Sequence, residues 1–381
     1  MPAARAAPAS PPQTFVERCR ALEDRRQGIS DEFKIFLADL RSYLETAAAF
    51  LDAEERALDV LDRFTREEML AAYLEEVAPR MIQRLNAASD ALVGLVKGLN
   101  EQEHATHRRY YREQVAAFML RSPLLGRAAG KPLGHAGDYE MMNMIYRDQA
   151  EGDSLFARAV NRYALQERCA QAVRSRLVYI GATIRATVEE RGRTRIASIG
   201  CGPAHELLLL LQQHPALGPH LDVALIDQDE RALAFCERTL APLAHATGAR
   251  IRFIRESVRR LVAARQPDEA LGPQDLIYSA GLFDYLSARS FSALLGRLYR
   301  ALAPGGKLLV GNVGTGNPTR TFMEYCLDWF LIHRSREELR GFARELQPEP
   351  SRVEVDAEPL GVNLFLCVSR SRARTTTDRT T

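Results

Sequence analysis

The residues best suited to chemistry lie in a short stretch near the middle of the chain, residues 195–206. The run Arg-Ile-Ala-Ser-Ile-Gly-Cys-Gly-Pro-Ala-His-Glu predicts a buried strand, a glycine turn and the start of an apolar helix. Glycine lacks a Cβ, so Gly200 and Gly202 can form a tight turn and let a ligand approach the main chain closely. The helix that follows begins with unpaired N–H groups, which attract a polar or anionic group. The stretch therefore predicts a site for a nucleotide-like cofactor.

The residues around this turn narrow the type of cofactor. A dinucleotide-binding fold would need a third glycine at position 205 for close packing of helix on strand, and His205 is there instead. The next predicted strand ends in Asp227, whose carboxylate can accept both hydroxyls of a ribose. Polar or glycine-rich residues also end the later strands, at Ser257, at residues 279–285 and at residues 304–306. We therefore expect a nucleoside-containing cofactor other than a dinucleotide.

The elements that position these residues are apolar strands alternating with helices. Strands are predicted at residues 196–199, 221–226, 250–254, 275–278 and 307–311, and a closing antiparallel pair at 351–355 and 362–368. Continuous apolar strands that alternate with helices indicate a mostly parallel α/β sheet covered on both faces. In such sheets a ligand binds beyond the carboxyl ends of the strands, near the switch point of the strand order.

The part of the chain before the sheet is predicted to be almost entirely helical. Residues 1–12 are rich in alanine and proline and are expected to be disordered, and residues 13–120 form a helical N-terminal domain. Pro79 lies within a helical pattern and is expected to kink or divide it. His104 and His107 share a helix face, which we interpret as a solvated face because no further ligand stands at an adjacent turn.

The composition and the hydrophobic periodicity change after the helical domain. Residues 121–153 are rich in glycine and proline with little periodicity, which fits either a plain linker or a loop lying over a binding site. Residues 154–190 are again helical. We assign residues 121–190 to a loop and helices that cap the active site, residues 191–370 to the cofactor-binding domain and residues 371–381 to a disordered tail.

Composition limits the class of protein and its compartment. A chain of 381 residues favours two domains, and a net charge of +2 gives no argument for nucleic acid or for a membrane surface. Its six scattered cysteines suit neither a zinc site nor a disulfide framework, so we predict no metal and reduced thiols. No apolar run has membrane-spanning length and no signal peptide is apparent, so a cytoplasmic protein is expected. The N-terminal helices could form a bundle over the sheet, a lid or a homodimer surface.

Taken in order, the turn and the strand ends resemble the class I S-adenosylmethionine-dependent methyltransferases over roughly residues 190–370. The resemblance implies a Rossmann-like methyltransferase sheet with an antiparallel last strand, preceded by an all-α domain, and S-adenosyl-L-methionine as the cofactor. The implied cofactor contacts are Ser198, Gly200, Gly202, Ala204, Asp227, Gln228, Ser257, Val258 and Ser279. The chain departs from the family pattern at three of these positions. Ser198 replaces the usual acidic residue, Ala204 the third glycine, and Ser257 the carboxylate at the adenine edge.

A narrower resemblance covers roughly residues 110–370. It is carried by the run Lys-Pro-Leu-Gly-His-Ala-Gly-Asp-Tyr-Glu at residues 131–140, by Gly-Cys-Gly-Pro-Ala-His-Glu at residues 200–206, and by the pair Asn317-Pro318. The chain here is similar to bacterial enzymes of the 3-hydroxypalmitic acid methyl ester biosynthesis type, which make a diffusible quorum-sensing signal. This resemblance implies methylation of the carboxyl group of a 3-hydroxy fatty acid.

The acceptor defines what further residues are needed. A fatty-acid carboxylate is ionised at neutral pH, so it needs no base, but it does need a cationic clamp and an apolar channel. Arg147 and Arg320 are candidate clamps, although an arginine of this kind is more often simply a solvated surface residue. The candidate wall residues are Tyr139, Tyr146, Tyr285, Asn312 and Trp329. A hydroxyl or amine acceptor would instead need a base, for which Asp284, Glu324 and His333 are the options.

The sequence is also compatible with two other functions. One is an O- or N-methyltransferase of a different small molecule or natural-product intermediate. The other is a non-catalytic module that binds S-adenosylmethionine and uses its N-terminal helices to engage a partner. No residue is identified as catalytic.

Overall fold

The computed structural model describes residues 28–263 and 272–372, and the statements below concern these residues. The disorder predicted for residues 1–12 lies outside them, as do residues 373–381 of the predicted tail. Within the described ranges no helix is both long and apolar enough to cross a membrane.

Among the described residues, seven strands form one mixed sheet in the C-terminal half of the chain. The strands are β1 (Thr194–Ile199), β2 (Leu221–Asp227), β3 (Arg250–Arg255), β4 (Gln274–Ser279), β5 (Leu302–Val313), β6 (Arg352–Ala357) and β7 (Asn363–Ser369). Their order is β3-β2-β1-β4-β5-β7-β6, and β7 runs antiparallel to both of its neighbours while the other pairs are parallel. This confirms the predicted Rossmann-like class I methyltransferase sheet with an antiparallel last strand. The strand order reverses between β1 and β4, so the switch point lies beside the glycine turn.

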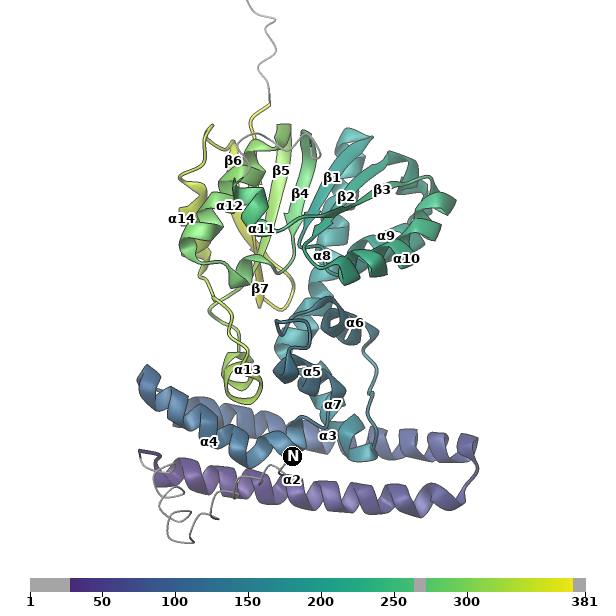
Figure 1. Cartoon of the computed structure of the whole chain (residues 1–381), viewed down its shortest axis with the longest axis vertical. Helices are drawn as coiled ribbons and strands as arrows, with labels where there is room; N and C mark the ends of the chain where they lie inside the picture. Colours follow the sequence, from purple (N-terminus) through teal and green to yellow (C-terminus); the bar gives the residue numbers. More distant parts are fainter. Residues whose placement is uncertain (1–27, 264–271, 373–381) are drawn as a thin grey trace, which may run out of the picture.

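Helices cover both faces of the sheet, as Figure 1 shows. One face carries α8 (Arg168–Arg191), α9 (His205–Gln213) and α10 (Glu230–Thr247), and the other carries α11 (Val258–Ala263), α12 (Ala288–Arg300) and α14 (Arg336–Ala343). Successive strand residues point to opposite faces, so Ile196 packs in the first core and Ala197 in the second. Short 3₁₀ turns complete this half at η2 (Pro215–His220) and η3 (Phe283–Tyr285).

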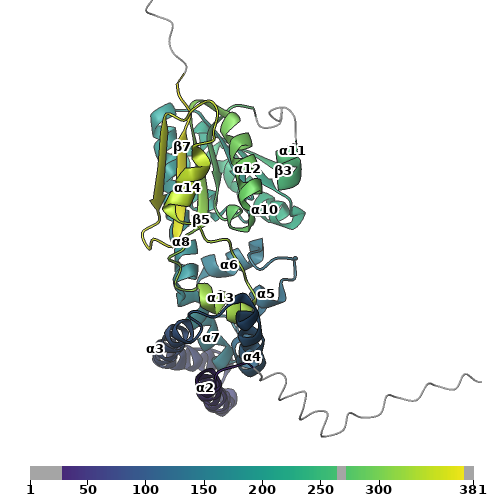
Figure 2. The same cartoon turned by 90° about the vertical axis from the view of Figure 1, so that its left-hand side faces the viewer.

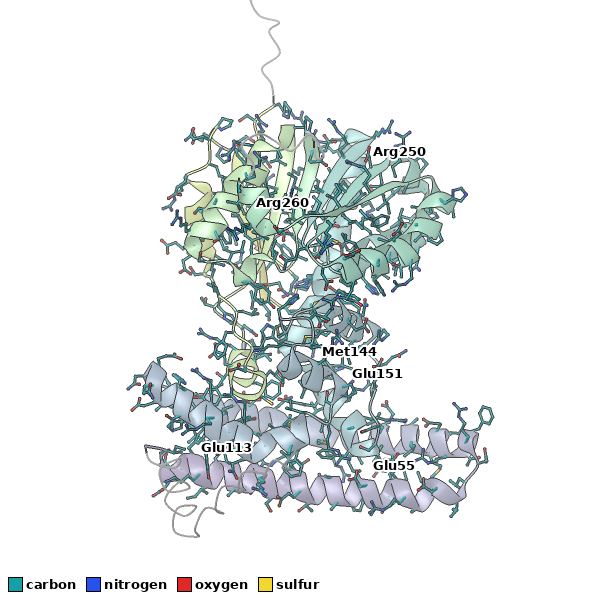
Figure 3. The ribbon with its side chains drawn as sticks, in the orientation of Figure 1. Glu55, Glu113, Met144, Glu151, Arg250 and Arg260 are labelled. Carbon is teal, nitrogen blue, oxygen red and sulfur yellow. The ribbon has the colours of Figure 1, made fainter. Side chains whose placement is uncertain are left out.

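The N-terminal half forms a separate layer of helices at one end of the sheet (Figures 1 and 2). We call it the helical module, and its elements are α2 (Asp31–Ala57), η1 (Leu58–Val60), α3 (Arg63–Leu95), α4 (Glu101–Met119), α5 (Pro123–Gly130), α6 (Tyr139–Arg147) and α7 (Leu155–Gln166). Glu55, labelled in Figure 3, connects three of them. Its carboxylate accepts the N–H of Leu155 at 2.7 Å and pairs with Arg66 at 3.0 Å.

One helix from the sheet half packs into the helical module. After β5 the chain leaves the sheet and forms α13 (Arg320–Leu327), which contacts α3, α4 and α5 (Figure 1). The Tyr325 hydroxyl lies 2.7 Å from Nδ1 of His104, and the Tyr325 ring packs edge-on against Tyr111. The core of the helical module is therefore completed by a segment that follows most of the sheet in the sequence.

Pro79 lies on the exposed side of α3, and the helix continues through it, so the predicted division of this helix is wrong. The solvated face predicted for His104 and His107 is wrong as well. His107 is buried with 3% of its surface exposed and packs edge-on against Phe33, while His104 bonds Tyr325, so this helix face is an internal contact. The apolar partners that cover these histidines come from distant parts of the chain, and helical periodicity contains no information about them.

The segment expected to lack periodic structure, residues 121–153, contains two short helices. The Ser122 hydroxyl caps α5 by accepting the N–H of Leu125 at 3.2 Å, and the Asp138 carboxylate caps α6 by accepting the N–H of Met141 at 2.8 Å. The predicted helix over residues 154–190 is instead divided into α7 and α8 at Glu167, whose ψ of 139° is extended. The predicted strand at residues 307–311 is the second half of the longer β5.

Candidate active site

The glycine turn has the backbone conformation that its sequence predicts. Gly200 and Gly202 have φ values of +63° and +54°, in the region that favours glycine. The N–H groups of Gly200 and Cys201 both donate to the Ile226 carbonyl, at 2.8 and 3.1 Å, which ties the turn to the end of β2. Ala204 also has a positive φ, +49°, a conformation that costs a residue with a Cβ about 1 kcal/mol.

Asp227 holds this turn from the end of β2. One carboxylate oxygen accepts the N–H of Gly202 at 2.9 Å, and the other accepts the N–H of Asp229 at 2.9 Å. Burial raises the pKa of Asp227, and the two backbone N–H groups partly oppose this shift. Each oxygen keeps a second acceptor site, so the fixed carboxylate can still accept bonds from a pair of ribose hydroxyls.

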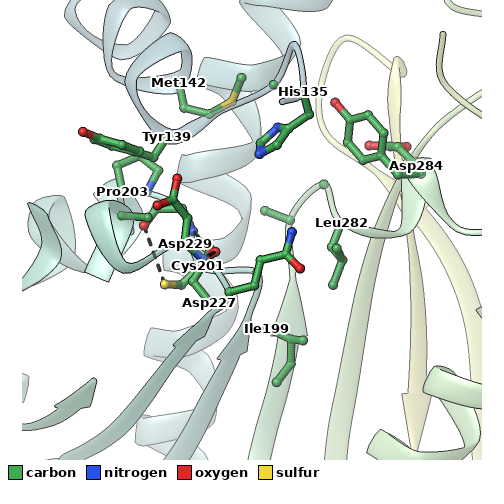
Figure 4. A pocket seen from close by; sticks show the side chains of 18 of the residues that line it. His135, Tyr139, Met142, Ile199, Cys201, Pro203, Asp227, Asp229, Leu282 and Asp284 are labelled. Atoms are coloured by element: carbon green, nitrogen blue, oxygen red, sulfur yellow. Dashed lines mark hydrogen bonds between the residues drawn. The ribbon is translucent and has the colours of Figure 1, made fainter. Parts of the chain in front are cut away.

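A cavity of about 320 Å³ lies over the carboxyl ends of β1, β2 and β4. Figure 4 shows it between the sheet side and the overlying segment. Ile199 and Asp227 come from the ends of β1 and β2, Leu282 from the loop after β4, and His135, Tyr139 and Met142 from the overlying segment. Residues from the segment 121–153 form one wall of the cavity. This favours the interpretation of the segment as a loop lying over a binding site rather than as a plain linker.

The predicted cofactor contacts fall into two groups. Gly200, Gly202, Asp227, Gln228 and Val258 line the cavity. Ser198, Ala204, Ser257 and Ser279 do not line it.

Three of these four residues outside the lining hold the site together through hydrogen bonds. Ser198 bonds the Tyr278 hydroxyl, and the Ser279 hydroxyl donates to the Ile199 carbonyl at 2.8 Å, which joins the ends of β4 and β1. The Ser257 hydroxyl accepts the N–H of Arg260 at the start of α11.

Aromatic side chains form the other end of the cavity. Of the predicted acceptor residues, Tyr139, Tyr146, Asp284, Tyr285 and Trp329 line it. The Trp329 Nε1–H donates to the Tyr285 hydroxyl at 3.0 Å. A Cβ at Gly137 would lie 2.6 Å from that same hydroxyl, so the overlying segment closes tightly on this pair. Tyr285 keeps 41% of its surface exposed, so this pair stands at the mouth of the cavity.

The other predicted acceptor residues lie outside the cavity lining. Arg147 pairs with Glu140 and Glu151, and Arg320 pairs with Glu324 at 2.7 Å. Asn312 is buried, donates to the carbonyls of Val313 and Ile332 and accepts from Arg334, so its amide is fully used within the protein. Among the candidate bases, Glu324 is engaged by Arg320 and His333 lies beside Asn317, which leaves Asp284 as the one in the cavity lining.

The lining also contains polar residues that the sequence predictions missed, Glu256, Glu206, His135 and Arg176. Glu256 directly precedes the predicted Ser257, so the signal of a polar strand end was present and its position differed by one residue. Arg176 belongs to a helix that precedes the sheet, and no motif marks it.

Burial governs the electrostatics of this end of the cavity. Burial raises the pKa of Asp284 to about 7, against the N–H of Val313 and the charges of Arg176 and Arg334. Burial likewise raises the pKa of Glu206, which accepts a bond from the Tyr278 hydroxyl at 2.7 Å. Across the described residues no group of three or more His, Cys, Asp or Glu side chains is arranged to hold a metal ion.

Comparison with known proteins agrees with this geometry. Residues 197–308 match a family described as a methyltransferase domain. No curated protein matches the chain. The crystal structure of a possible exported protein from Bordetella parapertussis is similar over 79% of this chain and 97% of its own, with a TM-score of 0.51 and 17% identity. At that identity the likeness shows the fold alone.

A second solved structure, the S-adenosylmethionine-dependent methyltransferase SibL in its apo form, has 18% identity and a TM-score of 0.43. The matched regions cover 71% of this chain and 74% of SibL. The family match reaches from β1 into β5 and contains the glycine turn, Asp227 and Asp284. The sheet half of the chain is therefore similar to methyltransferase domains over residues 197–308.

Proposed function

We propose that this enzyme transfers the methyl group of S-adenosylmethionine to the carboxylate of a small molecule with an apolar body, and that a 3-hydroxy fatty acid is the acceptor. The observation that carries the proposal is the composition of the cavity. Its sheet side has the glycine turn and Asp227, and its other side has Tyr139, Tyr146 and Trp329. An apolar compartment beside a cofactor site suits an acyl chain.

The residues at the sheet side would hold the nucleoside part of the cofactor. Asp227, fixed by two backbone N–H groups, would accept the ribose hydroxyls, and Val258 would pack on the adenine. The empty space around Gly202, where a Cβ would meet nothing within 4 Å, leaves room for the chain that joins ribose to methionine. The cofactor supplies an electrophilic methyl group on a sulfonium.

The protein's own part in the reaction is alignment and exclusion of water. An ionised carboxylate would accept the methyl group without losing a proton, and the products would be an ester and a neutral thioether. Rate enhancement then comes from holding the two groups in line within a dry compartment. Gly137, Tyr285 and Trp329, packed against one another, would close that compartment.

Asp284 favours a second candidate, methylation of a hydroxyl or amine on another small molecule. A carboxyl group with a pKa of about 7 in the cavity is suited to accept a proton from such an acceptor. We place this function second because the apolar wall is better explained by an acyl chain.

One assay separates these functions. The protein is incubated with S-adenosylmethionine labelled in the methyl group and with a bacterial lipid extract, and the product is treated with mild alkali. An ester releases its label as methanol, whereas an ether or N-methyl product keeps it. Binding of the cofactor without turnover on any extract would indicate instead a non-catalytic S-adenosylmethionine-binding module.

The Asp284→Asn variant sharpens the assay. A carboxylate acceptor needs no base, so this variant should keep kcat within about threefold, whereas a hydroxyl or amine acceptor would lose roughly 10²- to 10⁴-fold. With a 3-hydroxy fatty acid as the substrate, the product would be the methyl ester signal, made in the cytoplasm where the cofactor is available.

A further inference from the structure

Arg176 is a buried cation in the cavity, and it has no role in the proposed function described above. It lies on α8, lines the cavity and has 7% of its surface exposed. The elements around it come from three parts of the chain: α6 with Met142 and Tyr146, the end of β4 with Ala280, and η3 with Asp284. Arg176 therefore stands where the overlying segment meets the sheet.

The hydrogen bonds of this guanidinium are weak or missing. Nη1 reaches the Ala280 carbonyl at 3.5 Å, and Nη2 reaches the Met142 sulfur at 3.4 Å. Nε is buried without a hydrogen-bond partner in the described part of the chain. The Tyr146 hydroxyl supplies a further contact. A guanidinium has five N–H donors, so this one is far from satisfied.

The positive charge also lacks a partner. Within residues 28–263 and 272–372 no carboxylate forms an ion pair with Arg176. Asp284 stands across Gly281: a Cβ there would lie 3.1 Å from Nη1 of Arg176 and 3.6 Å from Oδ2 of Asp284. Burial raises the pKa of both Asp284 and Glu206, and neither carboxyl group lies within ion-pair distance of Arg176 in the described ranges.

A buried cation without an anion is costly, and an ion that enters the cavity can remove this cost. A carboxylate fits best, because the planar fork of arginine binds two carboxylate oxygens at once. We propose that Arg176 is the carboxylate-binding residue of this cavity. The carboxylate has two possible sources, the methionine part of the cofactor and the acceptor molecule. For the acceptor, the inference rests on the proposed function.

Contrast with the two predicted clamps supports this assignment. Arg147 and Arg320 have their own carboxylate partners and lie outside the cavity lining. Arg185, on the same helix as Arg176, is half-exposed and pairs with Glu189 at 3.7 Å. Arg185→Gln is therefore a matched control on α8 that leaves the cavity intact.

The cofactor source is tested by calorimetry with two ligands. S-adenosylhomocysteine has the α-carboxylate, and 5′-methylthioadenosine lacks the amino acid part. If Arg176 binds this carboxylate, Arg176→Met weakens S-adenosylhomocysteine by roughly 10- to 100-fold and leaves methylthioadenosine within about twofold of wild type. Arg176→Lys, which keeps the charge without the fork, should lie between the two.

The acceptor source is tested by the fluorescence of Trp329, the single tryptophan of the chain, which lines the cavity. 3-Hydroxyhexadecanoate and its primary amide are titrated separately into wild type and variants. If Arg176 binds the acceptor, Arg176→Met weakens the acid by roughly 10- to 100-fold, and the amide binds both proteins alike.

The outcomes are distinguishable. Selective weakening of either carboxylate ligand supports the proposal and identifies the source. The proposal is overturned if Arg176→Met and Arg185→Gln bind all four ligands as wild type does, or if Arg176→Met weakens charged and uncharged ligands equally, since that marks a structural role. Wild type could fail to bind the acid while Arg176→Met still weakens S-adenosylhomocysteine as expected. That result would contradict the proposed acceptor and leave the role of Arg176 intact. A thermal melt confirms that the variants fold, and removing a buried charge is not expected to lower the melting temperature.

Discussion

The buried carboxyl group of Asp284 makes the stability of the folded protein depend on pH. Its pKa of about 7 lies above the value of roughly 4 that an unfolded chain gives an aspartate. The folded protein therefore binds more protons than the unfolded chain between these values, and its stability decreases as pH rises through this window. The groups facing Asp284 are Arg176, Arg334, Cys169 and Tyr285, and none of these changes charge there.

Asp284→Asn should remove this pH-dependent loss. Above pH 7 we expect the variant to gain about 2–4 kcal/mol in the free energy of unfolding over wild type, and much less at pH 4. Urea denaturation at pH 4, 6 and 8 measures the difference. Asp153→Asn at an exposed position is the control, with an offset from wild type that does not change with pH. A constant offset for Asp284→Asn as well would contradict the raised pKa.

Gly200 should be the most sensitive position of the turn. Alanine there combines a φ of +63° with a Cβ only 3.2 Å from Leu282, so the turn must shift. We expect Gly200→Ala to weaken S-adenosylhomocysteine at least tenfold in calorimetry. Gly98→Ala has a φ of +90° but lies outside the cavity lining, so it should lower stability and leave affinity unchanged. Equal affinity for both variants would show that the turn does not hold the cofactor.

The role of a single residue could be predicted where the signal for it lies within a few neighbouring positions of the chain. The glycine turn and Asp227 follow from strand, turn and helix signals within a few residues of one another. Arg176 was missed because its importance comes from what surrounds it, namely Met142 on α6 and Ala280 at the end of β4. Nothing in the sequence near Arg176 contains that information.

At the scale of elements, burial on both faces made the central strands easy to predict. β1, β2 and β4 each have an apolar centre that is buried on both faces, and the polar or glycine residues of the site stand at or directly after the end of each strand. Helices α5 and α6 have only 8 and 9 residues, too few for a clear period, and their capping residues Ser122 and Asp138 were the better signal.

Helix α3 supports a prediction of its own. Pro79 lies in its interior on an exposed face and cannot donate the N–H that an uninterrupted helix requires. Pro79→Ala should therefore raise the free energy of unfolding by about 1–3 kcal/mol, as measured by urea denaturation. Arg80→Ala, also exposed and in the same turn, is the control and should change stability by less than about 0.5 kcal/mol. A loss of stability in Pro79→Ala would mean that the proline shapes the helix for its packing.

At the scale of the whole molecule, the tip formed by α2 and α3 exposes large apolar side chains. Val60 and Phe64 are each 88% exposed, and Phe50 is 56% exposed. Exposed apolar side chains are typical of interaction surfaces, so this tip is where we expect the homodimer contact through the N-terminal helices, which stays a prediction.

The prediction is that the protein has twice its monomer mass in light scattering after size-exclusion chromatography. The double variant Val60→Asp with Phe64→Asp should shift this mass to that of the monomer. A double variant at the opposite end of the molecule, Arg352→Asp with Glu354→Lys on β6, should leave the mass unchanged. A monomeric wild type would contradict the prediction.

The packing of α13 on the helical module has a consequence for synthesis of the chain. Tyr325 meets His104 across 221 positions of sequence, so the core of the N-terminal helices stays incomplete while most of the sheet is still being translated. Until that segment leaves the ribosome, the positions that Phe322 and Tyr325 will fill are open to other apolar chains. A nascent chain arrested before α13 should therefore remain bound to chaperones and sensitive to protease, and release should coincide with emergence of this one helix.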